Sequence, residues 1–262
     1  MLSDIWNAPL HDFPIRDEIL RQWLPESEWL DVLEVGPGSG YTAYRLAQRA
    51  KSVTLLETAS EAAADLEATF RLHKNVHCVC ADVCRRDLRD VLPRRFDVAF
   101  GLDVLEYVAD PAASLRNLCD LLRQGGVLLL TWPNIPPPLG DGVTYYRDRG
   151  ELDNVLKSAG FSQWSVFPVR MRTYAGAVFR VFHEWPLRLH RRWRPADGAM
   201  RPQTYDRTWA FRHRRRTLAF KTLLHVYWLF VGCAMRVGGP LFAVEDADPE
   251  IVGKQIVLCA KR

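Results

Sequence analysis

The chain has 262 residues, of which 48% are hydrophobic and 25% charged, and its formal net charge is +4. A chain of this length and composition is globular and can bury the core of one large α/β domain or two modest ones, which excludes a disordered polypeptide. The positive charge is concentrated: eleven Lys and Arg against two Asp between Arg188 and Lys221 give that segment +9 and leave the remainder at −5.

The cysteines and the N-terminus indicate a reducing cytoplasm. The N-terminal stretch MLSDIWNAPLHDF contains acids and prolines where a secretory signal has an apolar run, and the cysteine spacing is not that of a zinc ribbon. The stretch NVHCVCADVC alternates as a strand does. We therefore expect Cys78 and Cys80 to pack on one face as thiols, and we predict no metal site.

Apolar runs alternate with helical patterns from residue 15 onward. An amphipathic helix is predicted at 15–24, ahead of the alternation. Strands are then predicted within 31–35, 52–57, 76–82, 96–103 and 127–133, and helices at 41–50, 60–73 and 111–126. Strands that are continuous apolar runs separated by helices indicate a parallel sheet covered on both faces, with ligands at the carboxyl ends of its strands.

The glycine loop after the first of these strands is the strongest single signal. Gly36, Gly38 and Gly40 let the backbone turn sharply and let a ligand approach where a Cβ would collide. Glu57 ends the next strand 21 residues after Gly36, the spacing expected of a carboxylate that accepts hydrogen bonds from ribose hydroxyls. The glycines follow G-x-G-x-G, not the dinucleotide pattern, and Glu34 precedes them. Because a carboxylate suits a cationic amino group better than a pyrophosphate, we predict a nucleoside ligand of another kind.

With the motifs that follow, the chain resembles the class I S-adenosylmethionine-dependent methyltransferases, particularly the small-molecule branch that includes quinone-biosynthesis enzymes. The matching pieces are VLEVGPGSG, the acid of VTLLE, CADV, FDVAFGLDVLEYVADP, LLRQGGVLLLTWPN, ELDNVLKSAGF, the sixth strand SQWSVFPV and the last strand GKQIVLCAKR. The resemblance covers residues 14–169 and resumes at 253–262. It implies a Rossmann-like α/β fold: a seven-stranded, mostly parallel sheet with helices on both faces and an antiparallel last strand between strands five and six.

The resemblance also implies S-adenosylmethionine as the cofactor. The implied contacts are Glu34, Gly36, Pro37, Gly38 and Gly40 around the methionine moiety, Glu57 at the ribose, Asp82 and the Val83 backbone at the adenine, and the carbonyls of Gly101 and Leu102 near the methionine amino group. For Glu57 and Asp82 the alternative is a solvated acid at a strand end. Asp97 begins the fourth strand, and we expect it to lie away from the ligand edge.

Candidate residues for the acceptor side follow from the chemistry. Methyl transfer is an in-line displacement that needs alignment, and it needs a base only when the acceptor holds its proton tightly. Asp103 is the first candidate for orienting or deprotonating the acceptor, with capping of the helix VLEYV as its alternative. Tyr107, the other candidate catalytic residue, replaces the histidine that the resembled branch has in LEH, which argues against a histidine-based mechanism there. Tyr145, Tyr146 and His11 are candidates for acceptor binding, against packing for the tyrosines and simple exposure for His11.

Residues 170–248 form a basic and aromatic segment that the core family does not require, and we predict a helical insertion there. Only fourteen residues separate Lys221 from Arg236, which is too short for a transmembrane helix. A helix here would present a broad apolar surface that acts as a lid, forms a homodimer, or rests on an anionic membrane with Arg188–Arg236 on lipid phosphates. Nucleic acid is disfavoured as a partner, because the arginines cluster before the apolar block and not among its rings.

Together these features predict an enzyme whose methyltransferase core comprises residues 1–169 and 249–262. We expect it to transfer a methyl group from S-adenosylmethionine to a hydrophobic or lipid-like small molecule, as a cytoplasmic protein peripheral to the inner membrane face. The alternatives are a catalytically silent cofactor-binding scaffold, an RNA methyltransferase, and an NAD-dependent oxidoreductase, which the glycine spacing disfavours. The residues do not indicate which molecule accepts the methyl group, or whether oxygen, nitrogen or carbon receives it.

Overall fold

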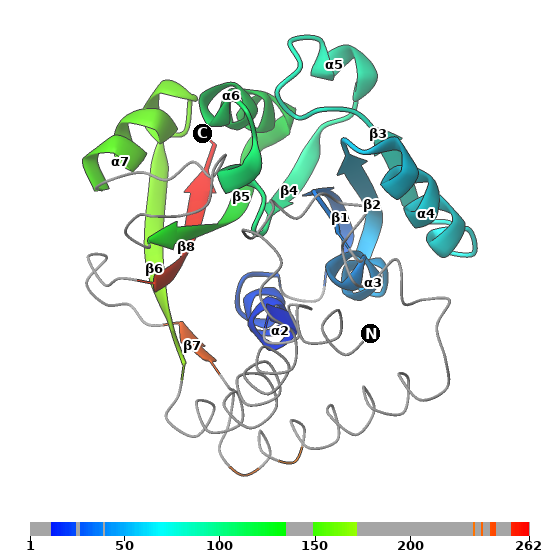
Figure 1. Cartoon of the computed structure of the whole chain (residues 1–262), viewed down its shortest axis with the longest axis horizontal. Helices are drawn as coiled ribbons and strands as arrows, with labels where there is room; N and C mark the ends of the chain where they lie inside the picture. Colours follow the sequence, from blue (N-terminus) through cyan, green and yellow to red (C-terminus); the bar gives the residue numbers. More distant parts are fainter. Residues whose placement is uncertain are drawn as a thin grey trace, which may run out of the picture. The chain divides into compact units, whose positions relative to one another are not determined.

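A computed structural model gives the fold of the chain (Figure 1). The structure describes residues 12–24, 27–38, 40–134, 149–171, 233, 237, 242–244 and 253–261. It divides into two compact units, which we name the sheet unit, Glu26–Val169 with Val244–Arg262, and the second unit, Met1–Pro25 with Arg170–Ala243. The domain boundaries inferred from the sequence stay predictions.

Strands and helices alternate along the chain, and β7 and the last two residues of β6 reach into the second unit. The strands are β1 (Ser27–Val35), β2 (Ala50–Glu57), β3 (Val76–Cys80), β4 (Phe96–Gly101), β5 (Leu122–Asn134), β6 (Gln163–Met171), β7 (Phe242–Val244) and β8 (Gly253–Ala260). The helices are α3 (Tyr41–Ala47), α4 (Ser60–Phe70), α5 (Leu88–Val91), the 3-10 turn η1 (Leu105–Tyr107), α6 (Pro111–Leu121) and α7 (Arg149–Ser158), and α2 (Asp12–Trp23) belongs to the second unit.

The strand order is β3-β2-β1-β4-β5-β8-β6-β7 (Figure 1). The five strands from β1 to β5 run parallel, whereas β8 is antiparallel to both β5 and β6. The predicted Rossmann-like sheet, with an antiparallel last strand between the fifth and sixth strands, is therefore confirmed. The short strand β7 beyond β6 was not predicted, because it lies within the segment that the sequence assigned to a helical insertion.

Buried apolar side chains join the sheet to helices on both of its faces. Leu118 of α6 and Leu156 of α7 lie in one buried cluster with Leu128 of β5. Leu46 of α3 and Leu66 of α4 are also fully buried but lie outside that cluster, and their helices contact β2 and β3. This two-sided cover explains why the parallel strands are continuous apolar runs and not alternating ones.

Side chains form hydrogen bonds with backbone groups at both ends of α6. At its start the Asp110 carboxylate accepts a hydrogen bond of 2.9 Å from Ala113 N, and a proline occupies the first turn. Beyond its end, Lys261 Nζ donates to the carbonyls of Cys119 at 2.6 Å and Leu122 at 3.1 Å. A cation at a helix C-terminus complements the helix dipole, so the last residues of the chain also stabilise this helix.

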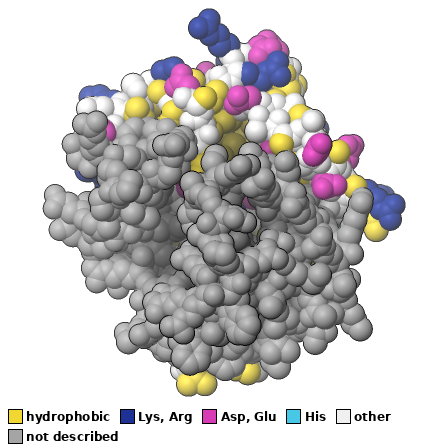
Figure 2. All heavy atoms as spheres, in the orientation of Figure 1, with side chains coloured by type: hydrophobic (Ala, Val, Ile, Leu, Met, Phe, Trp, Pro, Cys, Tyr) yellow, Lys and Arg dark blue, Asp and Glu magenta, His cyan; other side chains and the backbone are white. Residues whose placement is uncertain are grey.

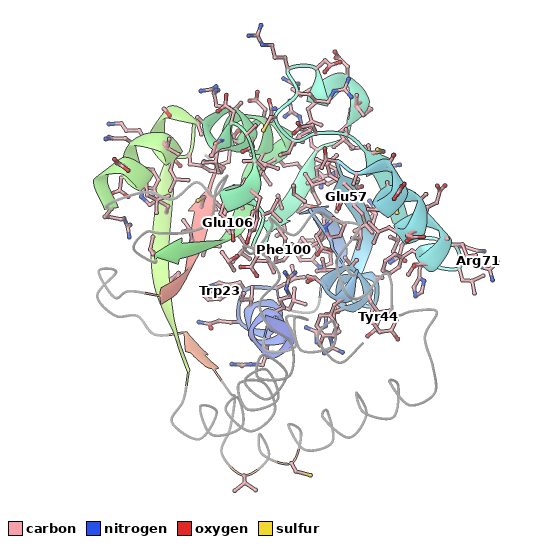
Figure 3. All side chains as sticks on the ribbon, in the orientation of Figure 1. Trp23, Tyr44, Glu57, Arg71, Phe100 and Glu106 are labelled. Carbon is pink, nitrogen blue, oxygen red and sulfur yellow. The ribbon has the colours of Figure 1, made fainter. Side chains whose placement is uncertain are left out.

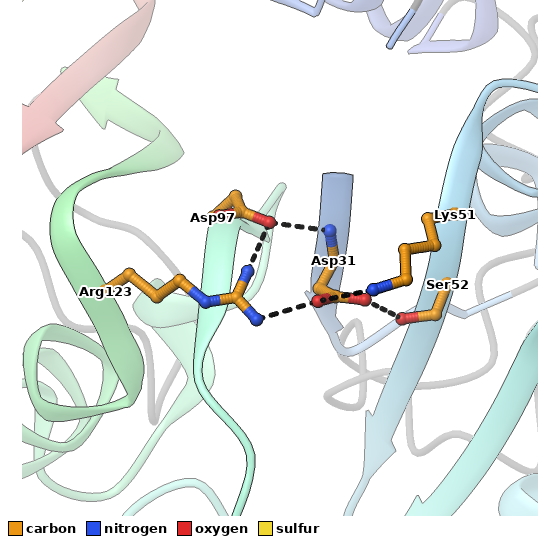
Figure 4. Close-up of polar contacts among 5 residues, drawn as sticks. All are labelled: Asp31, Lys51, Ser52, Asp97 and Arg123. Atoms are coloured by element: carbon orange, nitrogen blue, oxygen red, sulfur yellow. Dashed lines mark hydrogen bonds and ion pairs between the residues drawn. The ribbon is translucent and has the colours of Figure 1, made fainter. Parts of the chain in front are cut away.

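An ion-pair cluster ties β1, β4 and β5 together at their amino ends (Figure 4). Arg123 donates to Asp97 Oδ2 at 2.5 Å and to Asp31 Oδ2 at 2.8 Å, and Asp97 Oδ2 also accepts from Asp31 N. Burial opposes ionisation of Asp31, but the hydrogen bonds from Ser52 and Arg123 and the charge of Lys51 outweigh it and lower the pKa of Asp31. As expected, Asp97 lies at the edge opposite the carboxyl ends of the strands, where it contributes to stability.

Charged side chains of both signs are interspersed over the described part of the visible face (Figure 2). Within the ranges that the structure describes, no helix combines the length and the apolar character needed to cross a membrane. Of the predicted membrane-contacting segment Arg188–Arg236, only Cys233 is described, and it lies at an exposed helical position, as does Val237 just beyond it.

Candidate active site

The site is built at the carboxyl ends of the central strands. The order β2-β1-β4 places the change of winding direction at β1 and β4, which is where open α/β sheets bind their ligands. In register, Glu34 of β1 lies opposite Leu55 of β2 and Phe100 of β4. Three candidate segments therefore meet here: the loop after β1, the end of β2 and the turn after β4.

The loop after β1 lies tightly against the turn after β4. Gly36 N donates to Leu56 O at 2.9 Å, and Gly36 has a φ of +59°. A Cβ added at Gly36 would lie 2.6 Å from Val104 Cγ2, which is closer than side chains approach one another. Glycine at this position is therefore required both by the backbone conformation and by the contact with the turn after β4.

Gly38 lies at the tip of the loop. Its φ is +53°, and no described atom would lie within 4 Å of a Cβ added there. Pro37 is buried beside it, and Pro37 O accepts a hydrogen bond of 2.9 Å from Gly40 N, which fixes the turn into α3. A loop with a fixed base, and with no described side chain against its tip, fits a ligand that approaches the backbone closely.

Glu34 lies on the opposite face from its neighbours in the strand. Leu33 and Val35 belong to the apolar cluster beneath α6 and α7, so alternation turns Glu34 to the other face. Its side chain is only 2% exposed. In such a low-dielectric position a carboxylate interacts more strongly with a cationic group than it does in water, which fits the predicted contact with an amino group.

Glu57 is the last residue of β2 and is 5% exposed (Figure 3). Burial raises the pKa of Glu57, while hydrogen bonds from the backbone N–H groups of Ala59 and Thr58 act against that increase. The bond from Ala59 N to Glu57 Oε1 measures 3.0 Å and holds the carboxylate at the strand end. The alternative of a solvated acid is therefore wrong for Glu57, whose carboxylate is buried and oriented.

Asp82, in contrast, is exposed, which agrees with the alternative of a solvated acid at a strand end. Its Oδ1 accepts a hydrogen bond of 2.8 Å from Cys84 N, so the side chain is nonetheless oriented. Val83 is buried, and its carbonyl accepts from Asn117 Nδ2 at 2.8 Å. These contacts fix the backbone after β3, next to Glu57, whose register partner is Cys80.

The thiols of β3 differ in exposure. Cys78 is half-buried, and burial raises the pKa of its thiol to about 11. Cys80 is exposed, so the expectation that both thiols pack was wrong for Cys80. The strand ends at this residue, and the sheet edge beyond it leaves its side chain in solvent.

The turn after β4 contains the only non-glycine residue with positive φ among those that the structure describes. Gly101 and Leu102 are buried, and Asp103 follows with a φ of +57°. A left-handed residue costs about 1–2 kcal/mol, although Asp tolerates it better than most. Thr131 of β5 offsets this cost, because its hydroxyl accepts from Asp103 N at 2.5 Å and donates to Asp103 Oδ1 at 2.8 Å.

Asp103 does not cap the short helix that follows it. The N-cap of η1 is Val104, with no side-chain hydrogen bond to the helix. Tyr107 ends η1 and is 64% exposed. Tyr145, Tyr146 and His11 lie outside the described residues.

Sequence reasoning missed Thr131 as part of this site. The only available signal was a single hydroxyl near the end of the apolar run VLLLTWP. Nothing in the sequence indicated that this hydroxyl meets a residue 28 positions earlier.

Comparisons with known proteins agree with this geometry. Residues 33–128 match a family described as a methyltransferase domain. The ubiquinone biosynthesis O-methyltransferase of Alkalilimnicola ehrlichii is 32% identical over 130 residues, 49% of this chain and 52% of that protein. The tRNA 5-carboxymethoxyuridine methyltransferase of Escherichia coli is 32% identical over 124 residues, 45% of each protein. The chain therefore spans about half the length of these relatives.

A solved structure with a similar fold is Haemonchus contortus phosphoethanolamine N-methyltransferase 2 in complex with S-adenosyl-L-methionine. It aligns with a TM-score of 0.53 at 15% identity over 94% of this chain and 52% of that chain. The strand order of the sheet unit and the match of residues 33–128 to a methyltransferase domain agree with each other. Residues 33–128 are therefore similar to a methyltransferase domain, within a sheet that has the Rossmann-like fold.

Proposed function

We propose that the chain binds S-adenosylmethionine at the carboxyl edge of its sheet and transfers the methyl group to a hydrophobic small molecule. The observation that carries this proposal is the position of the glycine loop after β1 between two buried carboxylates, Glu34 of β1 and Glu57 at the end of the neighbouring strand β2. Glu34 would contact the amino acid moiety of the cofactor and Glu57 its ribose. S-adenosylmethionine contains both of these parts.

When bound, S-adenosylmethionine supplies a methyl group activated by its sulfonium. The chain's own residues align this group with the acceptor and exclude water, which is the main requirement of an in-line displacement. Glu57 accepts hydrogen bonds from the ribose hydroxyls, and Glu34 balances the charge of the amino group. The backbone of Leu102 and Asp103 forms the wall between this cofactor position and the acceptor.

Cofactor binding is tested by calorimetric titration of the full chain with S-adenosylmethionine and, separately, with NADH. We expect binding of the first only; tight binding of NADH without a response to S-adenosylmethionine would support an oxidoreductase. Glu57→Gln should weaken S-adenosylmethionine binding roughly tenfold or more, because hydrogen bonds to a charged acceptor contribute about 1.5–3 kcal/mol. The control is Glu67→Gln, the same change at an exposed position of α4, which should leave the affinity unchanged.

Methyl transfer is tested with a labelled methyl group and fractionated extract of the source cell. Label in the lipid-soluble fraction supports a hydrophobic acceptor, and label in RNA would favour the activity that one relative's name states. Failure to label any fraction, with the cofactor still bound, would favour a catalytically silent scaffold.

The hydrophobic acceptor also suggests contact with a membrane surface through Arg188–Arg236. The local charge of +9 between Arg188 and Lys221 supports this, because each Lys or Arg near an anionic bilayer contributes about 1 kcal/mol. We expect the chain to co-sediment with anionic liposomes and not with neutral ones. Equal recovery with both would contradict the electrostatic part and favour a lid or a dimer element.

A further inference from the structure

The Thr131 hydroxyl does more than satisfy a strained backbone. It accepts a hydrogen bond from Asp103 N, which stabilises the left-handed turn. It also donates to Asp103 Oδ1, and this second bond fixes the carboxylate itself. A hydroxyl has one proton to donate, and Thr131 donates it to the Asp103 carboxylate.

Thr131 and Asp103 lie within the candidate active site at the carboxyl ends of the strands. Val104, the next residue after Asp103, contacts the position where a Cβ of Gly36 would lie. Gly101 is in register with Leu130, so Thr131 lies beside the residue that follows β4. Thr131 is 2% exposed, whereas Asp103 is only half-buried and can be reached from solvent. A buried donor thus orients the carboxylate of a half-buried residue next to the glycine loop.

We infer that Thr131 is a positioning residue that holds the Asp103 carboxylate as the proton acceptor for a hydroxyl-bearing acceptor molecule. This inference rests on the proposed methyl transfer and narrows its acceptor class to hydroxyl compounds. Strained backbone that is held by specific contacts is concentrated at functional sites. The Thr131 hydroxyl stabilises this strained turn and fixes the orientation of the Asp103 carboxylate. A fixed orientation is what a proton acceptor in an active site requires.

The proposed step balances in protons and electrons. The O–H bond of the acceptor breaks and its proton passes to the Asp103 carboxylate. An oxygen electron pair forms the new O–CH3 bond as the methyl–sulfur bond breaks, and the electron pair of the broken bond stays on sulfur, which becomes neutral. Asp103 is left protonated and returns its proton to water when the methyl ether leaves.

The test compares two probe acceptors that differ in their need for a base. Phenol, which titrates near the tyrosine value of about 10, holds its proton at weakly alkaline pH, whereas 4-nitrophenol is ionised there. General base catalysis contributes about 10²–10⁴-fold. We expect Thr131→Val to lower kcat for phenol by about 10-fold or more while changing kcat for 4-nitrophenol less than about 3-fold. Thr131→Ser, which retains the hydroxyl, should restore the rate with phenol.

Asp103→Asn is the second variant, since it leaves Thr131 intact and should show the same selective loss with phenol. Calorimetric titration with S-adenosylmethionine accompanies each assay. Equal losses with both phenols, at unchanged cofactor affinity, would reduce Thr131 to a structural role and overturn the inference. Wild-type protein that binds the cofactor but methylates neither phenol would overturn the hydroxyl acceptor alone, whereas absence of cofactor binding would overturn the proposed function.

Discussion

Alanine substitution at Gly38 separates backbone strain from loss of ligand contact, because the chain contains a matched glycine elsewhere. Gly38 has a φ of +53° and Gly125 has a φ of +74°, and no described atom would lie within 4 Å of a Cβ at either position. Gly38 follows β1 at the carboxyl edge, whereas Gly125 lies in the turn at the start of β5, where its N–H donates to Lys261 O. Both substitutions therefore carry the same backbone cost.

That cost is about 1–2 kcal/mol for a left-handed alanine, which lowers the melting temperature of a unit of this size by roughly 2–8 °C. At Gly38 alone the added methyl group enters the tip of the glycine loop, where the methionine moiety is proposed to lie. We expect Gly38→Ala to weaken S-adenosylmethionine binding at least tenfold, or about 1.4 kcal/mol, and Gly125→Ala to leave it unchanged.

Thermal denaturation and calorimetric titration of the two variants measure these effects side by side. Equal stability losses with unequal affinities are the expected result. Unchanged affinity in Gly38→Ala, at the same stability loss as Gly125→Ala, would refute the assignment of the loop as the cofactor cradle.

Four further predictions concern the sheet unit. Arg123→Gln should lower the free energy of unfolding by about 1–2 kcal/mol, because its ion pairs are only partly buried. Since the pKa of Asp31 is lowered in the folded state, this stabilisation is present above the ordinary pKa of 3.8 and lost as the pH falls; a loss that persists in strong acid would contradict it. Glu57→Gln should leave the melting temperature at neutral pH unchanged or higher, because the pKa of Glu57 is raised by burial and ionisation therefore costs stability. For the same reason the cofactor affinity of the unsubstituted protein should fall as the pH falls through that raised pKa, and a titration series flat through the acid range would argue against Glu57 as the ribose ligand. Lys261→Met should cost about 1 kcal/mol by removing the cap of α6, and an unchanged melting temperature would argue against the cap.

Local patterns predicted the five parallel strands and the loop, although β1 begins at Ser27 and β5 at Leu122, where the pattern had predicted the end of a helix. A buried parallel strand is a continuous apolar run, and a loop that turns sharply beside a ligand needs glycine, so both are visible over a few residues. The spacing from Gly36 to Glu57 is set by one helix and one strand, which is why the acid could be identified before its burial was known. The antiparallel last strand came from the resemblance and not from any local pattern.

Contacts between distant segments could not be predicted in the same way. The exposed thiol of Cys80 was missed because alternation assigns a face to a residue and does not say where the sheet ends. Asp82 and Glu57 were given one shared alternative, yet one is exposed and the other buried, since burial depends on what covers each strand end.

The alternating α/β architecture, the glycine loop and the acids that flank it could be inferred from local sequence, because each depends on residues close together in the chain. How those groups are held depends on contacts between distant segments. Arg123 reaches Asp31 across 92 residues, and Thr131 reaches Asp103 across 28. Hydrogen bonds depend on distance in space and not along the chain, so the orientation of the Asp103 carboxylate appeared only when β4 and β5 were placed side by side.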